Sequence, residues 1–524
     1  MADRNILLIE PGYKNKYPPL GLMKIAQYHG PHGKNDNIRF VKGEDKSVLE
    51  TAWDRIYVTT LFTFEWKKIE KSIEFAMEAA NGQSDKVFVG GIAASLLHEE
   101  FIKEKKWRGV RFIKGLLTGP APAALQLDSF SEELYSDDIY GPVIEGLIPD
   151  YSILDQIEYK YPVHDAYFVY ASRGCIRKCK FCGVPKLEGT QRDTDSISAV
   201  IYGVEALFGS KKDLMLMDNN VVASPRYKEI IAEIRDLGFE RGATLKRGRV
   251  DVQRRVDFNQ GIDARILSKD PMYLREMSTI AIKPLRIAFD HIGVRKPYDL
   301  SIRYAADAGL TDLSNYMLYN FHDTPEDLYQ RMHLNIELNE ELNIRIYSFP
   351  MRYQPVNLKD RSHIGKNWNR YYLRSMQIIL QATHGIVSGA PQFFRRAFGD
   401  TSEEFKELLI QPHHYTFNRE WFENLEGRAR REEYNAEMGR LSDIEKEELL
   451  KVLSGHNKSQ FRAAQKNIKN KKIKNIMEHY IPLGFEKERK IWDKQKEYRK
   501  NMKEMQMEIP EDERVEDAGI EVAA

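Results

Sequence analysis

The chain has 524 residues, of which 42% are hydrophobic and 11% aromatic, and its formal net charge is +1. This length exceeds what one hydrophobic core supports, so about three domains are expected. The balanced charge argues against a general nucleic-acid or membrane-surface binder. No apolar run approaches the roughly 18 residues of a membrane-spanning helix, and the amino terminus does not resemble a signal peptide. We therefore expect a cytoplasmic protein with no membrane partner.

The first part of the chain, residues 1–112, alternates short apolar runs with a helical pattern. Strands are expected at 6–9, 56–60 and 87–89, with a helix at 64–80. This alternation is typical of βαβ units, so the pattern predicts an α/β domain with a Rossmann-like parallel sheet. Ligands of such sheets lie beyond the carboxyl ends of the strands. No G-x-G-x-x-G motif is present, so nothing supports a dinucleotide site.

Residues 113–163 are less regular and are expected to form a connector. Strand–helix alternation resumes over 164–358, and polar residues follow nearly every strand. The expected strands are 166–171, 214–217, 255–259, 285–289, 316–319 and 344–347. Residues 359–509 have a helical pattern, with amphipathic spacing at 374–383 and 403–410. The acidic tail, 510–524, is expected to be disordered.

The three cysteines of the chain, Cys175, Cys179 and Cys182, lie within eight positions of one another. Iron–sulfur clusters are held by cysteine thiolates, and three ligands leave one iron open to another molecule. Zinc is the alternative, although a structural zinc site normally has four protein ligands; His164 or His291 would have to approach in space. An odd number of cysteines argues against disulfides. The triplet therefore predicts a metal centre, with an iron–sulfur cluster favoured.

The C-x3-C-x2-C spacing, with Phe181 directly before the third cysteine, resembles the radical S-adenosylmethionine (SAM) superfamily. The resemblance implies a [4Fe-4S] cluster on Cys175, Cys179 and Cys182, and a partial (β/α)6 TIM-like barrel over 164–358. It implies reductive cleavage of SAM to a 5′-deoxyadenosyl radical, which abstracts hydrogen from an unidentified substrate. A low-potential electron donor such as flavodoxin or ferredoxin is implied as a partner.

The N-terminal segments Glu10-Pro11-Gly12, 17–22 and 89–95 resemble the cobalamin-binding (B12-binding) domain of one radical SAM subclass. The D-x-H-x-x-G motif that supplies a cobalt ligand in that domain is missing, and His29 and His32 do not match it. Two hypotheses stay open for residues 1–112: a cobalamin-binding domain, and an accessory domain that docks substrate.

The resemblance also suggests residues that contact SAM. Phe181 would pack near the adenine, although it is equally well explained as a core aromatic residue. The other candidates follow predicted strands: Asp218, Asn219, Asn220, Gln260, Asp263, Arg265 and Asp290. The first three also fit an ordinary turn. Arg265 is suited to bind a carboxylate, although an ion pair with an acidic neighbour is the alternative. His291 departs from the family pattern.

Residues 320–327 resemble the segment after the fifth strand in the family, but Thr324, Pro325 and Asp327 also form the pattern of a helix cap. Capping is the simpler interpretation.

Basic residues gather at 241–255 and 466–474. They would suit a nucleic-acid partner, but solvated surfaces explain them as well, and the balanced overall charge favours the second interpretation. One alternative function is thus a zinc-stapled nucleic-acid-binding module without catalysis. The alternative within the superfamily is a cobalamin-dependent radical SAM methyltransferase. No cysteine remains for an auxiliary cluster or a methyl-carrying thiol.

Overall fold

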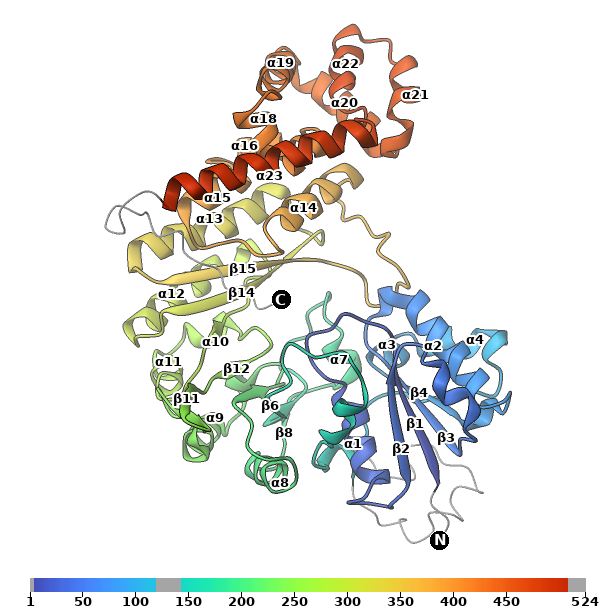
Figure 1. The fold of residues 1–524 in the computed structure, drawn as a ribbon. Helices are drawn as coiled ribbons and strands as arrows, with labels where there is room; N and C mark the ends of the chain where they lie inside the picture. Colours follow the sequence, from blue (N-terminus) through green and yellow to red (C-terminus); the bar gives the residue numbers. More distant parts are fainter. Residues whose placement is uncertain (1–3, 119–142, 508–524) are drawn as a thin grey trace.

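The computed structural model describes residues 4–118 and 143–507. Three parts are visible in Figure 1: an N-terminal parallel sheet in blue, a central strand–helix region in green and yellow, and a C-terminal set of helices in orange and red. The predicted acidic tail lies outside the described residues, as does the middle of the predicted connector.

The N-terminal part is one parallel sheet with the strand order β2-β1-β3-β4-β5. Its strands are β1 (Asn5–Glu10), β2 (Asn37–Lys42), β3 (Arg55–Thr60), β4 (Val87–Gly91) and β5 (Arg111–Phe112). Its helices are α1 (Leu20–His29), α2 (Trp66–Ala79), α3 (Ile92–Leu96) and α4 (His98–Lys103). The three predicted strands are present. Strands β2 and β5 were not expected, because they lie at the two edges, where partial exposure interrupts an apolar run with polar residues.

Alternate residues of the sheet face two different cores, as the two-residue period of a strand requires. In β1, Leu7 and Ile9 pack with α2 and α4 in a core confined to the N-terminal part. Ile6 and Leu8 belong instead to a larger core that extends through the central strands. The N-terminal sheet and the central region therefore share one continuous apolar interior.

Six strands of the central region pair with one another in parallel. They form two sheets, with the orders β12-β9-β6 and β13-β14-β15. Their bounds are β6 (Ala166–Val169), β9 (Asp213–Leu216), β12 (Val256–Phe258), β13 (Leu285–Arg286), β14 (Asp312–Tyr319) and β15 (Arg345–Arg352). An isolated parallel bridge between Ile262 and Ile287 joins the two sheets. All six strands match segments expected from the sequence.

Helices and short strands separate these six strands. The helices are α7 (Val184–Leu187), α8 (Ser198–Phe208), α9 (Tyr227–Ile234), α10 (Ala264–Leu267), α11 (Met272–Met277), α12 (Arg295–Asp307) and α13 (Pro325–Leu342). Thr324 and Asp327 form a capping box at the start of α13, with Pro325 in its first turn, so the expected cap is present. Two antiparallel pairs were not expected: β7 (Ser172–Arg173) with β8 (Arg192–Asp193), and β10 (Thr244–Arg247) with β11 (Val250–Gln253).

The hairpin β10–β11 carries much of the first basic cluster, and some of its cations already have partners. Arg247 forms an ion pair with Asp165, with 2.8 Å between Nη2 and Oδ1. Arg254, which follows the hairpin, donates to the carbonyls of Gly238 and Lys211 at 3.0 and 3.1 Å. These contacts favour a structural role for both arginines.

The C-terminal region is helical, as expected. Its helices are α14 (Arg370–Ala382), α15 (Pro391–Phe398), α16 (Ser402–Ile410), α17 (His413–Phe417), α18 (Arg419–Asn424), α19 (Arg428–Gly439), α20 (Asp443–Gly455), α21 (Phe461–Lys466), α22 (Lys471–Ile476) and α23 (Phe485–Met507). The predicted amphipathic segments correspond to α14 and α16. A separate core rich in tyrosine holds the outer helices together. In Figure 1, α23 crosses over this group.

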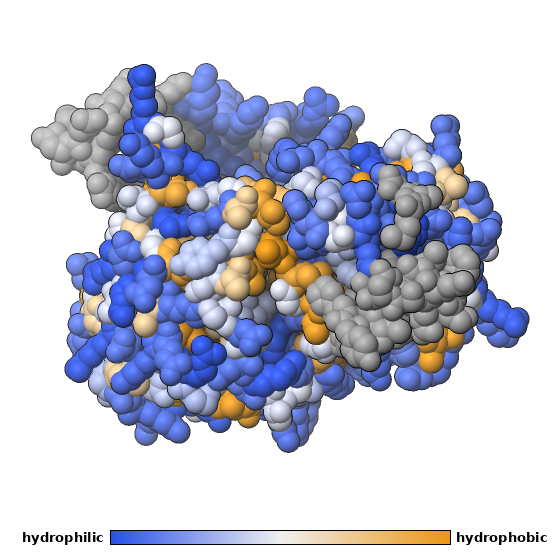
Figure 2. Space-filling model, turned by 90° about the horizontal axis from the view of Figure 1, so that it is seen from below, coloured by the Kyte–Doolittle hydropathy of each residue, from blue (hydrophilic) through white to orange (hydrophobic). Residues whose placement is uncertain are grey.

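Hydrophilic residues cover most of the face seen in Figure 2, and hydrophobic ones gather in a band near its centre. Within the described residues, we find no helix long and apolar enough to cross a membrane.

A buried ion pair connects the two central sheets. Arg286 on β13 donates from Nε and Nη2 to the two carboxylate oxygens of Asp257 on β12, both at 2.8 Å. The side chains of Arg286 and Asp257 are 5% and 11% exposed. A two-pronged charge-assisted contact fixes the relative position of both strands.

We predict that Asp257→Asn lowers the free energy of unfolding by about 3–5 kcal/mol, because it leaves the Arg286 guanidinium buried without its counter-charge. Urea unfolding followed by circular dichroism measures the change. Arg303→Ala is the control, since it breaks an ion pair with Glu341 at the surface and is expected to cost no more than about 1 kcal/mol. Equal effects of both changes would contradict this role.

Candidate iron–sulfur site

The cysteine loop is closed at its base by a short antiparallel pair. Ser172 and Arg173 on β7 pair with Asp193 and Arg192 on β8. Gly174 follows β7 with φ of 76°, and a Cβ on it would lie 2.3 Å from the carbonyl oxygen of Thr190. Only glycine fits this position without displacing backbone. The sequence therefore turns sharply into the segment that carries the three thiols.

Glu188 holds the two sides of the loop together. Its carboxylate accepts from the backbone N–H of Gly174 at 2.8 Å and from Nδ2 of Asn219 at 2.9 Å. Arg173 donates to the same carboxylate from Nη1 at 3.2 Å. The role of Glu188 was not expected, because a single glutamate at the end of a short helix forms no recognisable sequence motif.

The three thiols are half-buried. Burial raises the pKa of Cys179 and of Cys182, while the nearby Arg265 guanidinium acts to lower the pKa of Cys179. Backbone N–H groups of Arg177 and Val184 point at the sulfur atoms of Cys175 and Cys182, each at 3.4 Å. Such N–H donors stabilise thiolate ligands.

The spacing of the sulfur atoms bears on the kind of metal. Around one tetrahedral zinc ion with Zn–S bonds of 2.3 Å, sulfur ligands lie about 3.8 Å apart. Among the described residues, Cys175, Cys179 and Cys182 are not a group whose ligand atoms all lie within 4.8 Å. A cluster binds each thiolate through a different iron and accommodates wider spacing. The donor set therefore fits a cluster better than a single zinc ion.

The two histidines considered as a fourth zinc ligand, His164 and His291, do not join the cysteines in a zinc site. His164 bonds through Nδ1 to the carbonyl of Tyr161 at 2.9 Å, and it lines a cavity with Tyr151 and Lys211. His291 is exposed, and burial together with Arg265 lowers its pKa. Neither is part of a ligand group with the cysteines among the described residues.

Of the three polar residues after β9, Asp218 is used by the protein itself. Its carboxylate accepts from the backbone N–H groups of Ala171 and Ser172 and from the Ser172 hydroxyl. Burial raises the pKa of Asp218 to about 6, although these hydrogen bonds oppose the shift. Asp218 thus anchors the entrance to the cysteine loop, and its carboxylate is bonded to the protein rather than open to a ligand.

Asn219 and Asn220 differ from Asp218 and from each other. Asn219 bonds to Glu188, as described above. Asn220 is 4% exposed, and its Nδ2 is buried without a hydrogen-bond partner among the described residues. Its Oδ1 accepts from the backbone N–H of Asp263 at 3.5 Å. A buried, unused donor beside the loop is what a polar ligand would satisfy.

Asp263, Arg265 and Arg177 form a charged group at the loop. Asp263 Oδ1 accepts from Nε of Arg265 at 2.7 Å, and Oδ2 accepts from Nε of Arg177 at 2.6 Å. Burial alone would raise the pKa of Asp263, but these hydrogen bonds hold it below its usual value. The ion pair left open as an alternative for Arg265 is therefore present. The Arg265 side chain stays 39% exposed, so it can also reach a ligand.

The remaining candidates lie around this group. Burial raises the pKa of Asp290 to about 6, and Arg331 and Arg265 oppose the shift. Gln260 is exposed and Phe181 half-buried. Phe181 contacts Phe321 edge-on, with ring centroids 5.8 Å apart. The structure thus brings Phe181, Asn220, Asp263, Arg265 and Asp290 to the surroundings of the cysteines.

The carboxyl end of the N-terminal sheet meets the cysteine loop. A Cβ on Gly183, next to Cys182, would lie 3.4 Å from Leu96 of α3. In Figure 1, α7 lies between the central strands and α3. At this end of the sheet the Thr60 hydroxyl is used by the protein itself, because it donates to the Gly90 carbonyl at 2.8 Å and accepts from the N–H of Ala94 at 2.9 Å.

Two N-terminal histidines, His29 and His98, already bond to other groups of the protein, whereas His32 is exposed. Both ring nitrogens of His29 are engaged, by Asp36 at 2.8 Å and by the Tyr57 hydroxyl at 3.0 Å. His98 bonds through Nε2 to the carbonyl of Phe112. Cobalamin, if bound, would therefore use neither His29 nor His98 as the structure stands.

A positively charged cavity lies between the segment after β15 and the C-terminal helices. Its volume is about 700 Å³, and no aspartate or glutamate lines it among the described residues. Its cationic lining residues are Arg352, Arg361, Arg370, Arg374 and Lys458. Nε of Arg352 is buried without a hydrogen-bond partner in the described part of the chain.

Aromatic rings in edge-to-face contact connect the cysteine loop to the neighbours of this cavity. Phe321, which contacts Phe181, lies 4.6 Å from Tyr353, and Tyr353 lies 5.2 Å from His363 (centroid distances). The neighbours of His363, Ser362 and Ile364, line the cavity.

No protein-family model matches the chain, and no curated protein matches it. Two similar solved structures are of the radical SAM methyltransferase TsrM from Kitasatospora setae, one with tryptophan and the SAM analogue aza-SAM, the other with cobalamin and a [4Fe-4S] cluster. The first is 12% identical, with a TM-score of 0.47, and covers 68% of this chain and 75% of its own. The second is 13% identical, with a TM-score of 0.44, and covers 68% and 77%. These values are too low for the likeness to assign an activity to this chain.

We predict that Glu188→Ala weakens retention of the cluster by about 10- to 100-fold, the range for groups that orient metal ligands. The change removes no thiol but frees both sides of the loop. Iron per chain and visible absorbance after gel filtration without oxygen measure the effect. Glu229→Ala, at the exposed end of α9, is the control. A cluster held equally by both variants would show that Glu188 does not support the loop.

Proposed function

We propose that the chain is a radical SAM enzyme. The observation that carries the proposal is the set of three half-buried thiols on a closed loop, too widely spaced for one zinc ion and supported by backbone N–H donors. When bound at these thiols, a [4Fe-4S] cluster would supply the electron that cleaves SAM to methionine and a 5′-deoxyadenosyl radical.

The protein's own side chains have separate tasks in this proposal. Cys175, Cys179 and Cys182 hold the cluster as thiolates, and Arg265 favours the charged form of Cys179. The Asn220 amide would donate to SAM, and the free side of the Arg265 guanidinium would bind the SAM carboxylate. Phe181 would pack against the adenine. Each group is held by the fold before SAM binds.

The proposed function also assigns a role to each part of the chain. Residues 164–358 would form a partial (β/α)6 barrel with the cysteines near the carboxyl ends of its strands, where barrel enzymes place their chemistry. Residues 1–112 would form the B12-binding-like domain, 113–163 the connector and 359–509 the helical region. A cobalamin-dependent methyltransferase stays the second candidate, favoured by the contact between α3 and the loop.

The cationic cavity suggests the class of substrate. Five cations without a lining carboxylate favour an anionic group, and guanidinium is suited to bind carboxylate or phosphate. The ring contacts from Phe181 to His363 support a position of this cavity near the proposed SAM site. We propose that the substrate anchors an anionic group here and extends toward the loop.

We expect protein reconstituted without oxygen to form 5′-deoxyadenosine from SAM after reduction, and Cys179→Ala to abolish it, because one ligand of the cluster is lost. Chromatography of the quenched reaction measures the product. Lys180→Ala, an exposed change in the same loop, is the control and keeps the activity. Protein that binds only zinc under these conditions would rule out the proposal in favour of the zinc-stapled module.

We expect the double variant Arg370→Ala and Arg374→Ala to bind inorganic pyrophosphate at least about tenfold more weakly than the unchanged protein, because two exposed cations of the cavity are removed. Calorimetry at low salt measures the affinity, and binding should weaken as salt rises. The double variant Arg249→Ala and Arg428→Ala is the control, with the same loss of charge at two exposed arginines outside the cavity. Equal pyrophosphate affinity in all three proteins would contradict an anion site in the cavity.

A further inference from the structure

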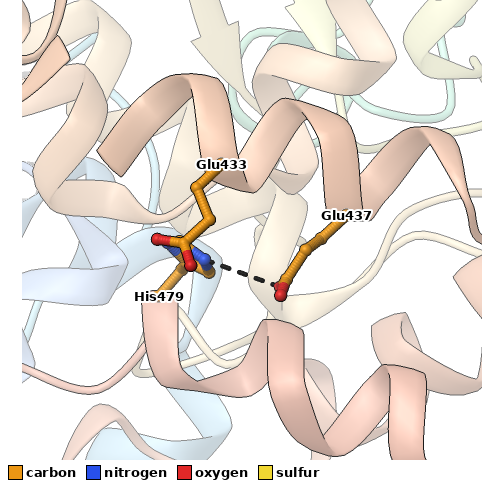
Figure 3. A group of neighbouring side chains, drawn as sticks. All are labelled: Glu433, Glu437 and His479. Carbon is orange, nitrogen blue, oxygen red and sulfur yellow. Dashed lines mark ion pairs between the residues drawn. The ribbon is translucent and has the colours of Figure 1, made fainter. Parts of the chain in front are cut away.

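Outside the cysteine loop, one group of side chains has the composition of a metal site. Glu433 and Glu437 lie one turn apart on α19, and His479 ends a 3₁₀ helix (Met477–His479) that follows α22. One ligand atom from each lies within 4.8 Å of the other two. Figure 3 shows both carboxylates reaching from α19 toward the imidazole.

The His479 side chain is buried and fixed in orientation. The residue is 3% exposed. Its Nδ1 hydrogen-bonds the Tyr415 hydroxyl at 2.7 Å, and Tyr415 is itself 1% exposed within the aromatic core of the C-terminal region. A metal-binding histidine is normally held through its second ring nitrogen in this way, which leaves the other nitrogen free for the metal.

The free nitrogen, Nε2, is directed at Glu437. It lies 3.6 Å from Oε2, beyond hydrogen-bond distance. That oxygen is buried and has no hydrogen-bond partner among the described residues. A buried carboxylate oxygen without a donor is costly unless another group satisfies it. Two potential ligand atoms thus face each other without a strong bond between them.

Electrostatics support a neutral imidazole. Burial lowers the pKa of His479 to about 4, and the Arg430 guanidinium acts in the same direction. Burial raises the pKa of Glu437, and the neighbouring Glu433 adds to this shift. Glu433 and Glu478 act in the opposite direction on His479. The neutral imidazole is the form that binds metals.

We propose that Glu433, Glu437 and His479 bind one divalent transition-metal ion, with zinc as the best fit. Zinc accepts imidazole nitrogen and carboxylate oxygen at 2.0 to 2.2 Å, so tetrahedral ligand atoms lie about 3.4 Å apart. The separation of 3.6 Å between Nε2 and Oε2 is close to this value. Three protein ligands leave a position for water, and the ion links α19 to the segment after α22.

Zinc binding to the full-length protein tests the proposal. The iron–sulfur cluster is first reconstituted, so that the cysteines are occupied, and other metals are removed with a chelator. Calorimetry with zinc chloride should then show one site per chain. His479→Gln and Glu437→Gln should each weaken it by at least about tenfold, and Tyr415→Phe, which leaves Nδ1 without its partner, should weaken it by about tenfold.

The control is Glu432→Gln, which changes the same charge on the same helix at a residue that pairs with Arg428. It should leave zinc binding unchanged. Circular dichroism before zinc addition identifies any variant that has lost helical structure. If His479→Gln or Tyr415→Phe has lost it, the zinc affinity of the isosteric Glu437→Gln tests the proposal. Absence of stoichiometric zinc, or equal affinity in Glu437→Gln and Glu432→Gln, would overturn the proposal. Neither outcome affects the proposed function of the cysteine loop.

Discussion

Two carboxylates determine the shape of the cysteine loop, and the proposed chemistry depends on that shape. Asp218 receives the backbone N–H groups at the entrance of the loop, and Glu188 joins Gly174 on one side to Asn219 on the neighbouring strand end. Backbone donors bonded to buried carboxylates are strong and directional. The thiols therefore lie on a segment whose ends are fixed, which is what a cluster with one open iron needs.

The thiols have a cation beside them, and an acidic side chain binds that cation from the other side. Arg265 lies next to Cys179, and Asp263 holds both Arg265 and Arg177. The acid keeps the cations in place without neutralising them fully, since Arg265 stays 39% exposed. A positive charge near the cysteines favours thiolate over thiol. The same guanidinium is available to a ligand carboxylate, so one residue can serve both the cluster and SAM.

All three parts of the chain converge on this region. The segment after β15 returns to the N-terminal domain, where Lys359 pairs with Glu104 at 3.1 Å and Arg361 lies over the Phe64 ring at 4.0 Å. Arg361 also lines the cationic cavity, together with residues of α14 and the loop after α20. The C-terminal helices thus contribute to the wall of the cavity, and the N-terminal domain supports the segment that carries Arg361.

The sequence by itself determined the order of the elements and the location of the thiols. The apolar runs marked all six central strands, and Thr324, Pro325 and Asp327 marked the start of α13, because strand periodicity and capping are local properties. Edge strand β2 and the short pair β7–β8 were not predicted, since their formation depends on partners that are distant in the sequence. Only the tertiary structure decided that Asp218 anchors the loop, that Nδ2 of Asn220 has no hydrogen-bond partner among the described residues, and that Glu188 joins the two sides of the loop. It also decided that Glu433 and Glu437 face His479 across more than 40 residues of chain, because contacts between remote segments leave no pattern in either one.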